Sequence, residues 1–376
     1  MSKIFHSVRL DADKCVGCTN CIKRCPTEAI RVRNKKAYII SDRCIDCGEC
    51  IRVCPQHAKY AVMEHLSEKD KFRYKIALPA PALYGQFNNL ENIDYVLTGL
   101  KKMGFDKVVE VSKAAEYISS ATRNMMRTES LKKPVISTAC PAVVRLIRIR
   151  FPNLIPNLLP LYAPVDFAAK IAREEAIKET GLKDEEIGVF FISPCPAKRT
   201  AIKNPLGYSK SGVDGAIAMK EIYPQLVHNM DKLSTDEVEL INDSGIIGVS
   251  WASSGGEASG LLKERYLAAD GIRNVINVLE ELEDEKLNDL DFIELNSCTG
   301  GCVGGVLTVE NPFVARARIQ HLRKFMPVSC NSIRNKYDLE DFGLTEEVTP
   351  SPAMKLADNV IYFKIKCTSF TLFTIN

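Results

Sequence analysis

The stretches CVGCTNCIKRCP (15–26) and CIDCGECIRVCP (44–55) are two copies of one pattern, Cys-x2-Cys-x2-Cys-x3-Cys-Pro. In such a pattern three closely spaced thiolates wrap one face of a cubane iron–sulfur cluster, and the fourth, turned by the following proline, reaches the other cluster. We therefore assign two 4Fe–4S clusters the ligand sets Cys15, Cys18, Cys21 and Cys54, and Cys44, Cys47, Cys50 and Cys25. A zinc module is the alternative, but zinc needs neither the third cysteine nor the duplicated proline.

Cysteine is unusually frequent and unevenly placed in this chain of 376 residues. Eight of the fourteen cysteines lie between residues 15 and 54, and the others are Cys140, Cys195, Cys298, Cys302, Cys330 and Cys367. The start of the chain has no continuous apolar stretch of the secretory type, so we expect a cytoplasmic location. In that compartment thiols indicate metal binding or redox chemistry more than disulfides.

The cysteine distribution and the charge divide the chain. Residues 1–75 carry sixteen Lys and Arg against nine Asp and Glu, and we expect a small two-cluster domain there. Residues 76–350 form a second predicted domain, and 351–376 a C-terminal tail that is either an added edge strand or a truncated or divergent end. Basic residues beside the motifs either offset the negative charge of the clusters and receive an acidic redox partner, or form an ordinary solvated face: Lys14, Lys23, Arg24, Arg43 and Arg52.

Composition excludes several function classes. A net charge of +3 is far from the basic balance of nucleic-acid binders, so no nucleic-acid partner is expected. No run of eighteen apolar residues exists, which argues against a membrane span. Neither a Gly-x-Gly-x-x-Gly fingerprint nor a phosphate-binding loop is present, so we expect no NAD, flavin or ATP site.

Beyond residue 75, short apolar runs alternate with helical periods, which predicts parallel α/β layers. The expected strands are 75–81, 107–112, 134–140, 186–195, 246–251 and 291–298. The expected helices are 89–103, 113–130, 141–150, 164–180, 218–231, 256–268 and 312–325. Cys140, Cys195 and Cys298 end such strands, where α/β sheets usually place their chemistry.

Four further thiols occur in three separated segments: STACPAVVRL (137–146), ISPCPAKRT (192–200) and ELNSCTGGCVGGV (294–306). Four thiols are the number that one more cubane cluster needs, here at an interface between two lobes. We expect the glycines of the third segment to let backbone approach an inorganic group closely. Lys198 would place an ammonium near that group, or it is a surface lysine at the start of a helix.

These three segments resemble, in order and separation, the signature stretches of the FeFe-hydrogenase family. The resemblance covers roughly residues 1–350 and implies an α/β hydrogenase catalytic domain of two lobes, with parallel sheets flanked by helices. It also implies that a small α+β, bacterial-type two-cluster ferredoxin domain precedes it.

By that resemblance the chain would hold an H-cluster, a 4Fe–4S cubane joined to a diiron subsite with carbonyl, cyanide and a dithiolate bridge. The cubane ligands would be Cys140, Cys195, Cys298 and Cys302. Cys302 would also bridge to the diiron subsite, and Lys198 with the Ser193–Pro194 backbone would contact cyanide. The implied activity is reversible splitting and formation of H2, with electrons passing through the two ferredoxin-type clusters.

The sequence departs from catalytic members of this family at several positions. Ala139 stands where they carry a cysteine that relays protons. Ser193, Ala201, Asn296 and Ala258 replace other typical residues, and the stretch LLPLYAP (158–164) lacks the serine of the family's proton path. A general acid–base group is worth ~10²–10⁴ in rate, on the order of 3–5 kcal/mol of barrier.

A sensor tolerates that loss, because it needs occupancy of a redox state rather than turnover. The substitutions therefore resemble those of sensory FeFe-hydrogenases, which implies low activity. The expected partners are H2 and protons, hydrogenase maturation proteins, and a redox or signalling protein such as a ferredoxin, a kinase or a phosphatase.

Two other functions stay open from the sequence. One is an electron-transfer or cluster-assembly protein that keeps the cubane cysteines without a diiron site. The other is a fast hydrogenase with a different proton route. Glu257 is a candidate proton carrier, although helix N-capping by Ser254 and a first-turn charge explain it equally well. Cys330 and Cys367 are read as incidental thiols and Trp251 as a core residue.

Overall fold

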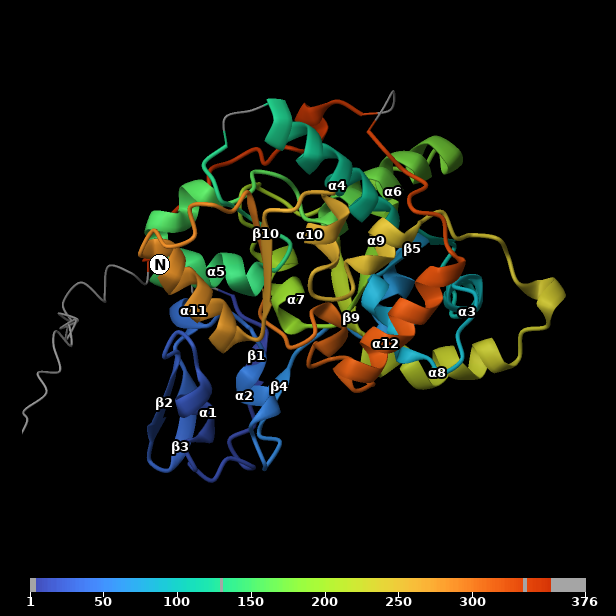
Figure 1. Cartoon of the computed structure of the whole chain (residues 1–376). Coiled ribbons are helices and arrows are strands. Elements are labelled where there is room, and N and C mark those ends of the chain that lie inside the picture. Colours follow the sequence, from blue (N-terminus) through green and yellow to red (C-terminus); the bar gives the residue numbers. More distant parts are fainter. Residues whose placement is uncertain (1–4, 129–130, 334–336, 353–376) are drawn as a thin grey trace, which may run out of the picture.

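A computed structural model describes residues 5–128, 131–333 and 337–352 (Figure 1). The first part is a small α+β module. It consists of two antiparallel pairs, β1 (Val8–Leu10) with β4 (Lys59–Ala61) and β2 (Ile30–Arg33) with β3 (Lys36–Ile39), and of helices α1 (Asn20–Arg24) and α2 (Glu49–Arg52).

The duplication in the sequence is also a duplication of the backbone. Each short helix carries the third cysteine of its motif and is preceded by a residue in the left-handed region, Thr19 at φ 65° and Gly48 at φ 80°. Glycine adopts that conformation without strain. At Gly48 a side chain would also collide with Val306, because a Cβ there would lie 2.7 Å from its nearest methyl carbon.

Two parallel sheets form the larger part. One has the order β6-β5-β8-β9 and the other β10-β11-β7. Their strands are β5 (Tyr74–Pro79), β6 (Lys107–Val108), β7 (Val135–Ile136), β8 (Ile187–Ser193), β9 (Gly215–Ala218), β10 (Tyr266–Asp270) and β11 (Phe292–Asn296). Every residue of β8 is buried, as expected for a parallel strand covered by helices on both faces.

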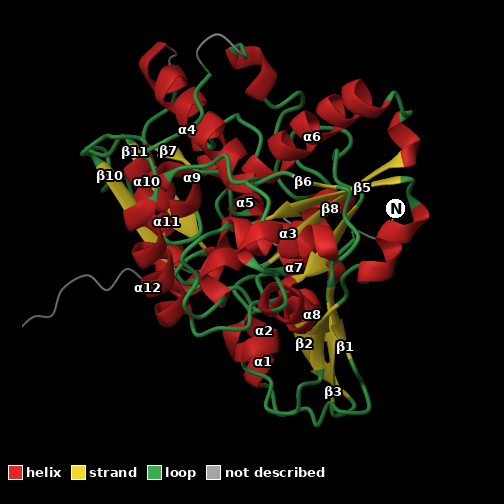
Figure 2. Ribbon diagram, turned by 90° about the vertical axis from the view of Figure 1, so that its right-hand side faces the viewer, coloured by secondary structure: helices red, strands yellow, loops and turns green. Residues whose placement is uncertain are grey.

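Helices surround both sheets (Figure 2). They are α3 (Asp94–Lys102), α4 (Val111–Thr128), α5 (Pro141–Arg150), α6 (Pro164–Thr180), α7 (Pro196–Lys203), α8 (Met219–Asp231), α9 (Ile246–Ser250), α10 (Gly256–Gly260), α11 (Ile272–Glu283) and α12 (Pro312–Leu322). Helix α6 packs against β5 and β8, and α11 against β10 and β11. The predicted α/β class, with parallel sheets flanked by helices behind a ferredoxin-like module, is confirmed.

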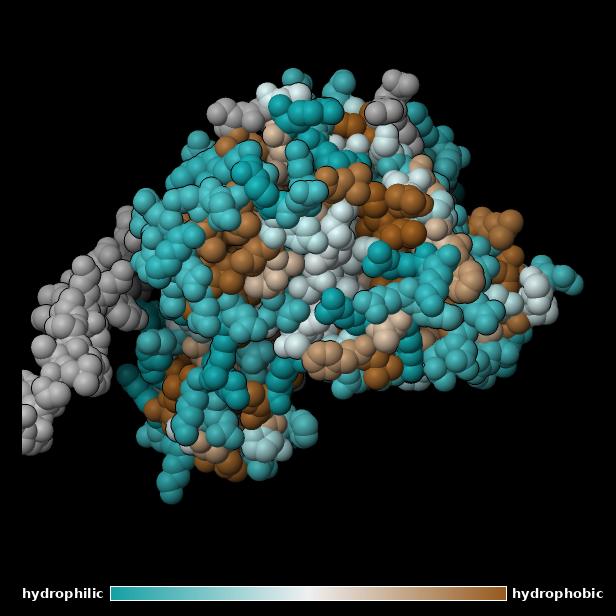
Figure 3. All heavy atoms as spheres, viewed as in Figure 1, coloured by the Kyte–Doolittle hydropathy of each residue, from teal (hydrophilic) through white to brown (hydrophobic). Residues whose placement is uncertain are grey.

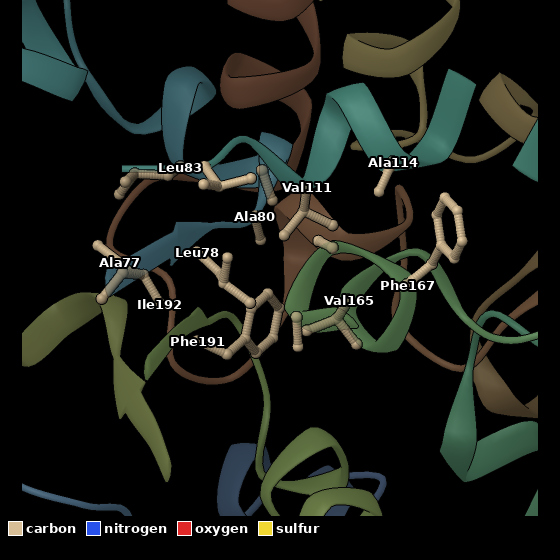
Figure 4. Close-up of a cluster of buried hydrophobic side chains, with 14 of the residues drawn as sticks. Ala77, Leu78, Ala80, Leu83, Val111, Ala114, Val165, Phe167, Phe191 and Ile192 are labelled. Carbon is tan, nitrogen blue, oxygen red and sulfur yellow. The ribbon is translucent and has the colours of Figure 1, made fainter. Parts of the chain in front are cut away.

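The main core lies between the four-stranded sheet and helices α4 and α6. Figure 4 shows Leu78 and Phe191 of the sheet beside Val111 of α4 and Val165 of α6. All four are at most 5% exposed. Burying a side chain of this size contributes roughly 1.5–3 kcal/mol, so this core fixes the ends of β5 and β8, from which the site described below is built.

Two of the predicted elements are wrong. Residues 246–251, predicted as a strand, form helix α9 and its C-terminal residue Trp251, because a short apolar run buried on all sides fits either element. The predicted helix 256–268 ends at Gly260. Leu262 follows with φ 55°, and the chain then enters strand β10 at Tyr266.

The N-terminal module is fastened to the larger part by buried polar contacts. Thr200 of α7 donates a 2.5 Å hydrogen bond to the Asp46 carboxylate, which also accepts from the backbone N–H of Val8 at 2.9 Å. Arg52 donates to the carbonyl oxygen of Gly304. Glu64 forms a 2.9 Å ion pair with an arginine of α7.

The predicted tail lies almost entirely outside the described residues, and the divisions after residues 75 and 350 stay predictions. No described helix is long and apolar enough to cross a membrane.

Candidate functional site

Two small cavities in the N-terminal module each meet four thiols. One is lined by Cys15, Cys18, Cys21 and Cys54, and the other by Cys44, Cys47, Cys50 and Cys25. Each cavity therefore takes three cysteines from one motif and the fourth from the other. Backbone N–H groups donate to the two fourth cysteines in matching positions, Ala29 to Cys25 at 3.1 Å and Ala58 to Cys54 at 3.3 Å.

Burial has a large effect on the thiols of the second of these cavities. It raises the pKa of Cys44 and of Cys47 well above the ordinary thiol value, and the pKa of Cys50 to about 12. Buried thiols of this kind stay protonated at neutral pH unless a metal displaces the proton. The donor set thus suits a bound metal group better than a set of free thiolates.

A third and larger cavity lies where strands of both sheets end. It is lined by the four dispersed cysteines, Cys140, Cys195, Cys298 and Cys302, and by Lys198. Cys140 and Cys195 are the N-cap residues of α5 and α7, each followed by a proline that starts the helix. The partial positive charge at these helix N-termini favours an anionic group in the cavity. The cavity volume is about 80 Å³, well above the ~10–15 Å³ that one water molecule requires.

The spacing of ligand atoms argues against single-ion sites. Zn–S bonds of about 2.3 Å place the sulfurs of a tetrahedral zinc site about 3.8 Å apart. Within the described residues, three or more ligand atoms lie within 4.8 Å of one another at His6, Cys44 and Asp46, and at none of the four-cysteine sets. The four-cysteine sets are thus more open than a single zinc ion requires, as a cluster of several metal ions needs.

Burial and nearby charges set the electrostatics of the large cavity, where Arg52 opposes the effect of burial at Cys298. Burial and the neighbouring thiols raise the pKa of Cys195 well above its ordinary value and that of Cys302 to about 12. The Lys198 ammonium opposes the shift at Cys302. Lys198 Nζ also donates a 2.9 Å hydrogen bond to the carbonyl oxygen of Ala139. Lys198 was predicted either to place an ammonium near the site or to be a surface lysine at a helix start. Its position in the cavity wall favours the first of these.

Two buried carboxyl groups line the same cavity, Glu257 and Glu294. Ser137 Oγ donates to Glu257 Oε2 at 2.5 Å, whereas Glu294 accepts from the backbone N–H groups of Gly255 and Ala258, each at 2.9 Å. Burial, and then repulsion by Glu294, raise the pKa of Glu257 well above 4.5. The protonated form of Glu257 is therefore favoured. This side chain can hold a proton beside the cavity.

Of the alternative explanation of this stretch, capping by Ser254 is wrong, whereas Glu257 does lie in the first turn of α10. The N-cap of α10 is Gly255, at φ 84°, and no side chain caps the helix. Trp251 lines the cavity, and its indole N–H donates to Ser119 at 3.0 Å, so it is only in part a core residue.

Two glycines of the third segment, Gly304 and Gly305, lie against protein backbone, and the expected close approach to an inorganic group stays a prediction. A Cβ at Gly305 would lie 2.2 Å from the carbonyl oxygen of Pro194, and one at Gly304 would lie 2.0 Å from that of Thr299. Their missing side chains allow close packing of protein backbone, and Gly301 and Gly305 also line the cavity. Ser193 is fully buried and its hydroxyl donates to the carbonyl oxygen of Cys195 at 2.9 Å, whereas Pro194 faces the cavity.

Sequence reasoning missed Glu294 and Asp46. Glu294 is a charged residue inside the apolar run of β11, and Asp46 lies between two cysteines of the second motif. A carboxylate in such a place is a signal of buried function, because burying it without partners is costly. Cys330 is exposed and Cys367 lies outside the described residues.

Comparison with known proteins agrees with this geometry. The chain matches the family model described as iron only hydrogenase large subunit, C-terminal domain, over residues 73–266 and 257–306, and the 4Fe-4S dicluster domain over 7–55. It is 16% identical to a solved structure of a variant FeFe-hydrogenase from Chlamydomonas reinhardtii, with a TM-score of 0.54 over 79% of this chain and 93% of that one. That likeness supports the fold.

Curated relatives include hydrogenases and cluster assembly factors. Iron hydrogenase 1 of Clostridium pasteurianum is 22% identical over 369 residues, which cover 80% of this chain and 64% of the relative. The cytosolic Fe-S cluster assembly factor of Saccharomyces cerevisiae is 25% identical over 170 residues, 43% of this chain and 34% of the relative. The chain thus spans less than two thirds of the length of either relative.

Proposed function

The chain belongs to the iron-only hydrogenase large-subunit family, and from that premise we propose that it is a sensory hydrogenase with slow, reversible H2 chemistry. It is an iron–sulfur protein of the hydrogenase type with an N-terminal 4Fe-4S dicluster domain. The observation that carries the proposal is the convergence of Cys140, Cys195, Cys298 and Cys302 on one buried cavity beside Lys198, with no thiol at Ala139.

The residues of the large cavity suit both parts of an H-cluster. The four thiols would hold the cubane, and Cys302 would also bridge to the diiron unit. Beyond the thiols the wall is mainly apolar, with Val111, Val165 and Phe191, and Lys198 provides a positive charge for an anionic ligand such as cyanide. When bound, such a centre supplies the reversible conversion of H2 into two protons and two electrons.

The protein's own task is to move protons and electrons to and from this cavity. Glu257 holds a proton beside the cavity and receives a hydrogen bond from Ser137. The methyl group of Ala139 cannot carry a proton from the reacting centre to that carboxyl. A missing relay costs ~10²–10⁴ in rate, and this loss suits a protein that reports the presence of H2 better than one that consumes it.

The shared lining of two cavities supports a route for electrons to the surface. Cys47 lines both the second small cavity and the large one. Cys18 of the first small cavity is exposed. Electrons would thus pass from the large cavity to the second and then the first cluster, and on to a redox or signalling protein in the cytoplasm. Maturation proteins would supply the diiron unit.

A second function is favoured by a specific observation, the similarity to cluster assembly factors. In that case the large cavity would hold a cubane without a diiron unit. Infrared spectroscopy after anaerobic maturation separates the two. Bands of bound carbonyl and cyanide, with about 14 iron atoms per chain, support the sensory hydrogenase; about 12 iron atoms and no such bands after full maturation support the alternative.

A further inference from the structure

Lys59 is a buried ammonium without a hydrogen-bond partner. It is the first residue of β4, pairs with Leu10 across the antiparallel ladder, and is 3% exposed. Among the described residues its Nζ has no hydrogen-bond partner. Removing an unpaired charge from water is costly, so an anion close to Nζ is needed to offset it.

The side chain of Lys59 lines the first small cavity, the one that also meets Cys15, Cys21 and two further thiols. It does not line the second small cavity. Burial raises the pKa of Cys21 and of Cys50 in the second cavity, and the Lys59 charge opposes the rise at both thiols. At Cys15 burial is opposed by backbone N–H groups and then by Lys59, and the pKa is lowered. A thiolate-ligated cluster in the first cavity would be the anion that Lys59 lacks.

The second small cavity has the opposite charge in its wall. Asp46 lines it, is 1% exposed, and repels negative charge at Cys44 and Cys50. Arg145, a buried cation whose charge reaches Asp46 and Cys44, does not line this cavity and donates to the carbonyl oxygen of Asn204 at 2.7 Å. A positive charge beside a cluster stabilises its reduced form and a negative charge destabilises it, strongly so in a poorly solvated interior.

We propose that Lys59 makes the site of Cys15, Cys18, Cys21 and Cys54 the more easily reduced of the two N-terminal sites. Each site takes up one electron, so an electron leaving the large cavity comes to rest at the first site, the one with the exposed thiol. In Figure 3 the surface of this module, at lower left, mixes hydrophilic and hydrophobic residues, as a transient docking face does. Through its charge, Lys59 thus determines which of the two sites holds the electron. The inference rests on the two cluster sites of the proposed function.

Potentiometric titration of the reconstituted full chain, followed by electron paramagnetic resonance, tests this proposal. In the wild type we expect two separate reduction steps. In Lys59→Met the cluster of the more positive step should become harder to reduce. Its ratio of reduced to oxidised form at a fixed potential should fall at least tenfold, which corresponds to a 59 mV more negative reduction potential for one electron. Lys59→Arg keeps the charge and should keep the ratio within threefold.

Lys36→Met is the matched control. Lys36 is also a cation near Cys15, but it is exposed, so water screens its charge. Its loss should change the ratio by less than threefold. Iron and sulfide contents equal to those of the wild type show that both sites are filled in each variant.

Three results overturn the proposal: no shift in Lys59→Met, a shift confined to the more negative step, or equal effects of the two lysines. If the first site of Lys59→Met does not bind its iron–sulfur cluster, the variant Asp46→Asn provides the test instead. That variant should raise the reduced fraction at the more negative step at least threefold, and no rise counts against the proposal. Two clusters of equal potential in the wild type would contradict this inference alone, whereas no cluster signal would contradict the proposed function.

Discussion

Restoring a thiol at position 139 should raise the rate of hydrogen oxidation. The backbone N–H of Ala139 donates to Ser137 Oγ at 3.2 Å, and Ser137 in turn donates to Glu257 at 2.5 Å. The carbonyl oxygen of Ala139 is held by Lys198. A cysteine in Ala139→Cys would therefore stand in the cavity wall beside a carboxyl that already holds a proton.

The size of the effect follows from what a relay contributes. A positioned acid–base group is worth ~10²–10⁴ in rate, or on the order of 3–5 kcal/mol. Because other family residues of the proton path are also missing, we expect a gain smaller than this range, of at least about tenfold. The assay is H2-dependent dye reduction by matured protein, with rates normalised to the infrared intensity of the diiron unit.

Two matched variants make the test specific. Ala139→Ser adds a group of similar size that does not titrate near neutral pH, so it should give little gain. Adding Glu257→Gln to Ala139→Cys should abolish most of the gain if the thiol acts through that carboxyl. The reasoning is refuted if Ala139→Cys, with its diiron unit loaded, is no faster than the wild type, or if the gain survives in the double variant.

Four further predictions concern loading and stability. Cys298→Ser should lose about four iron atoms per chain, whereas exposed Cys330→Ser should lose none; equal iron contents would count against the ligand assignment. Lys198→Met should keep about 12 iron atoms but bind the diiron unit poorly, so undiminished infrared bands would exclude a role for the ammonium. Burial raises the pKa of Glu257 well above 4.5, so the folded wild type binds the proton more tightly than the unfolded chain does. The free energy of unfolding should therefore fall as pH rises from 4.5 towards the pKa of the folded state. In urea unfolding Glu257→Gln should lack this fall, and the same pH dependence in both proteins would contradict the prediction. Gly305→Ala places a Cβ 2.2 Å from a backbone oxygen and should cost about 1–3 kcal/mol of unfolding free energy, which an unchanged denaturant midpoint would contradict.

The parts of the molecule that follow local rules were predictable. The two cysteine motifs define which four thiols share a cavity, because a three-residue spacing brings side chains together within one turn of chain. The strand ends at Cys140, Cys195 and Cys298 were predicted because buried parallel strands are short apolar runs. The joining of all three ends with Cys302 in one cavity followed from the family resemblance and the cysteine count together.

Other features depend on contacts that sequence patterns do not encode. Helix α9 reads as a strand because its apolar residues are buried on all sides by segments far away in the chain. The pairing of Asp46 with Thr200 joins residues 154 positions apart. The closeness of Glu257 to Glu294 likewise appears only once α10 is packed against β11. Buried polar pairs of this kind decide proton and electron behaviour and are the least visible in a single sequence.

Anomalous diffraction at the iron absorption edge, from crystals of anaerobically matured protein, tests the central claim most directly. Our account predicts three separate iron centres, the third of them bounded by the sulfur atoms of Cys140, Cys195, Cys298 and Cys302 and extended past Cys302 toward Lys198. Iron confined to the two N-terminal sites, with the large cavity free of metal in fully matured protein, would contradict it.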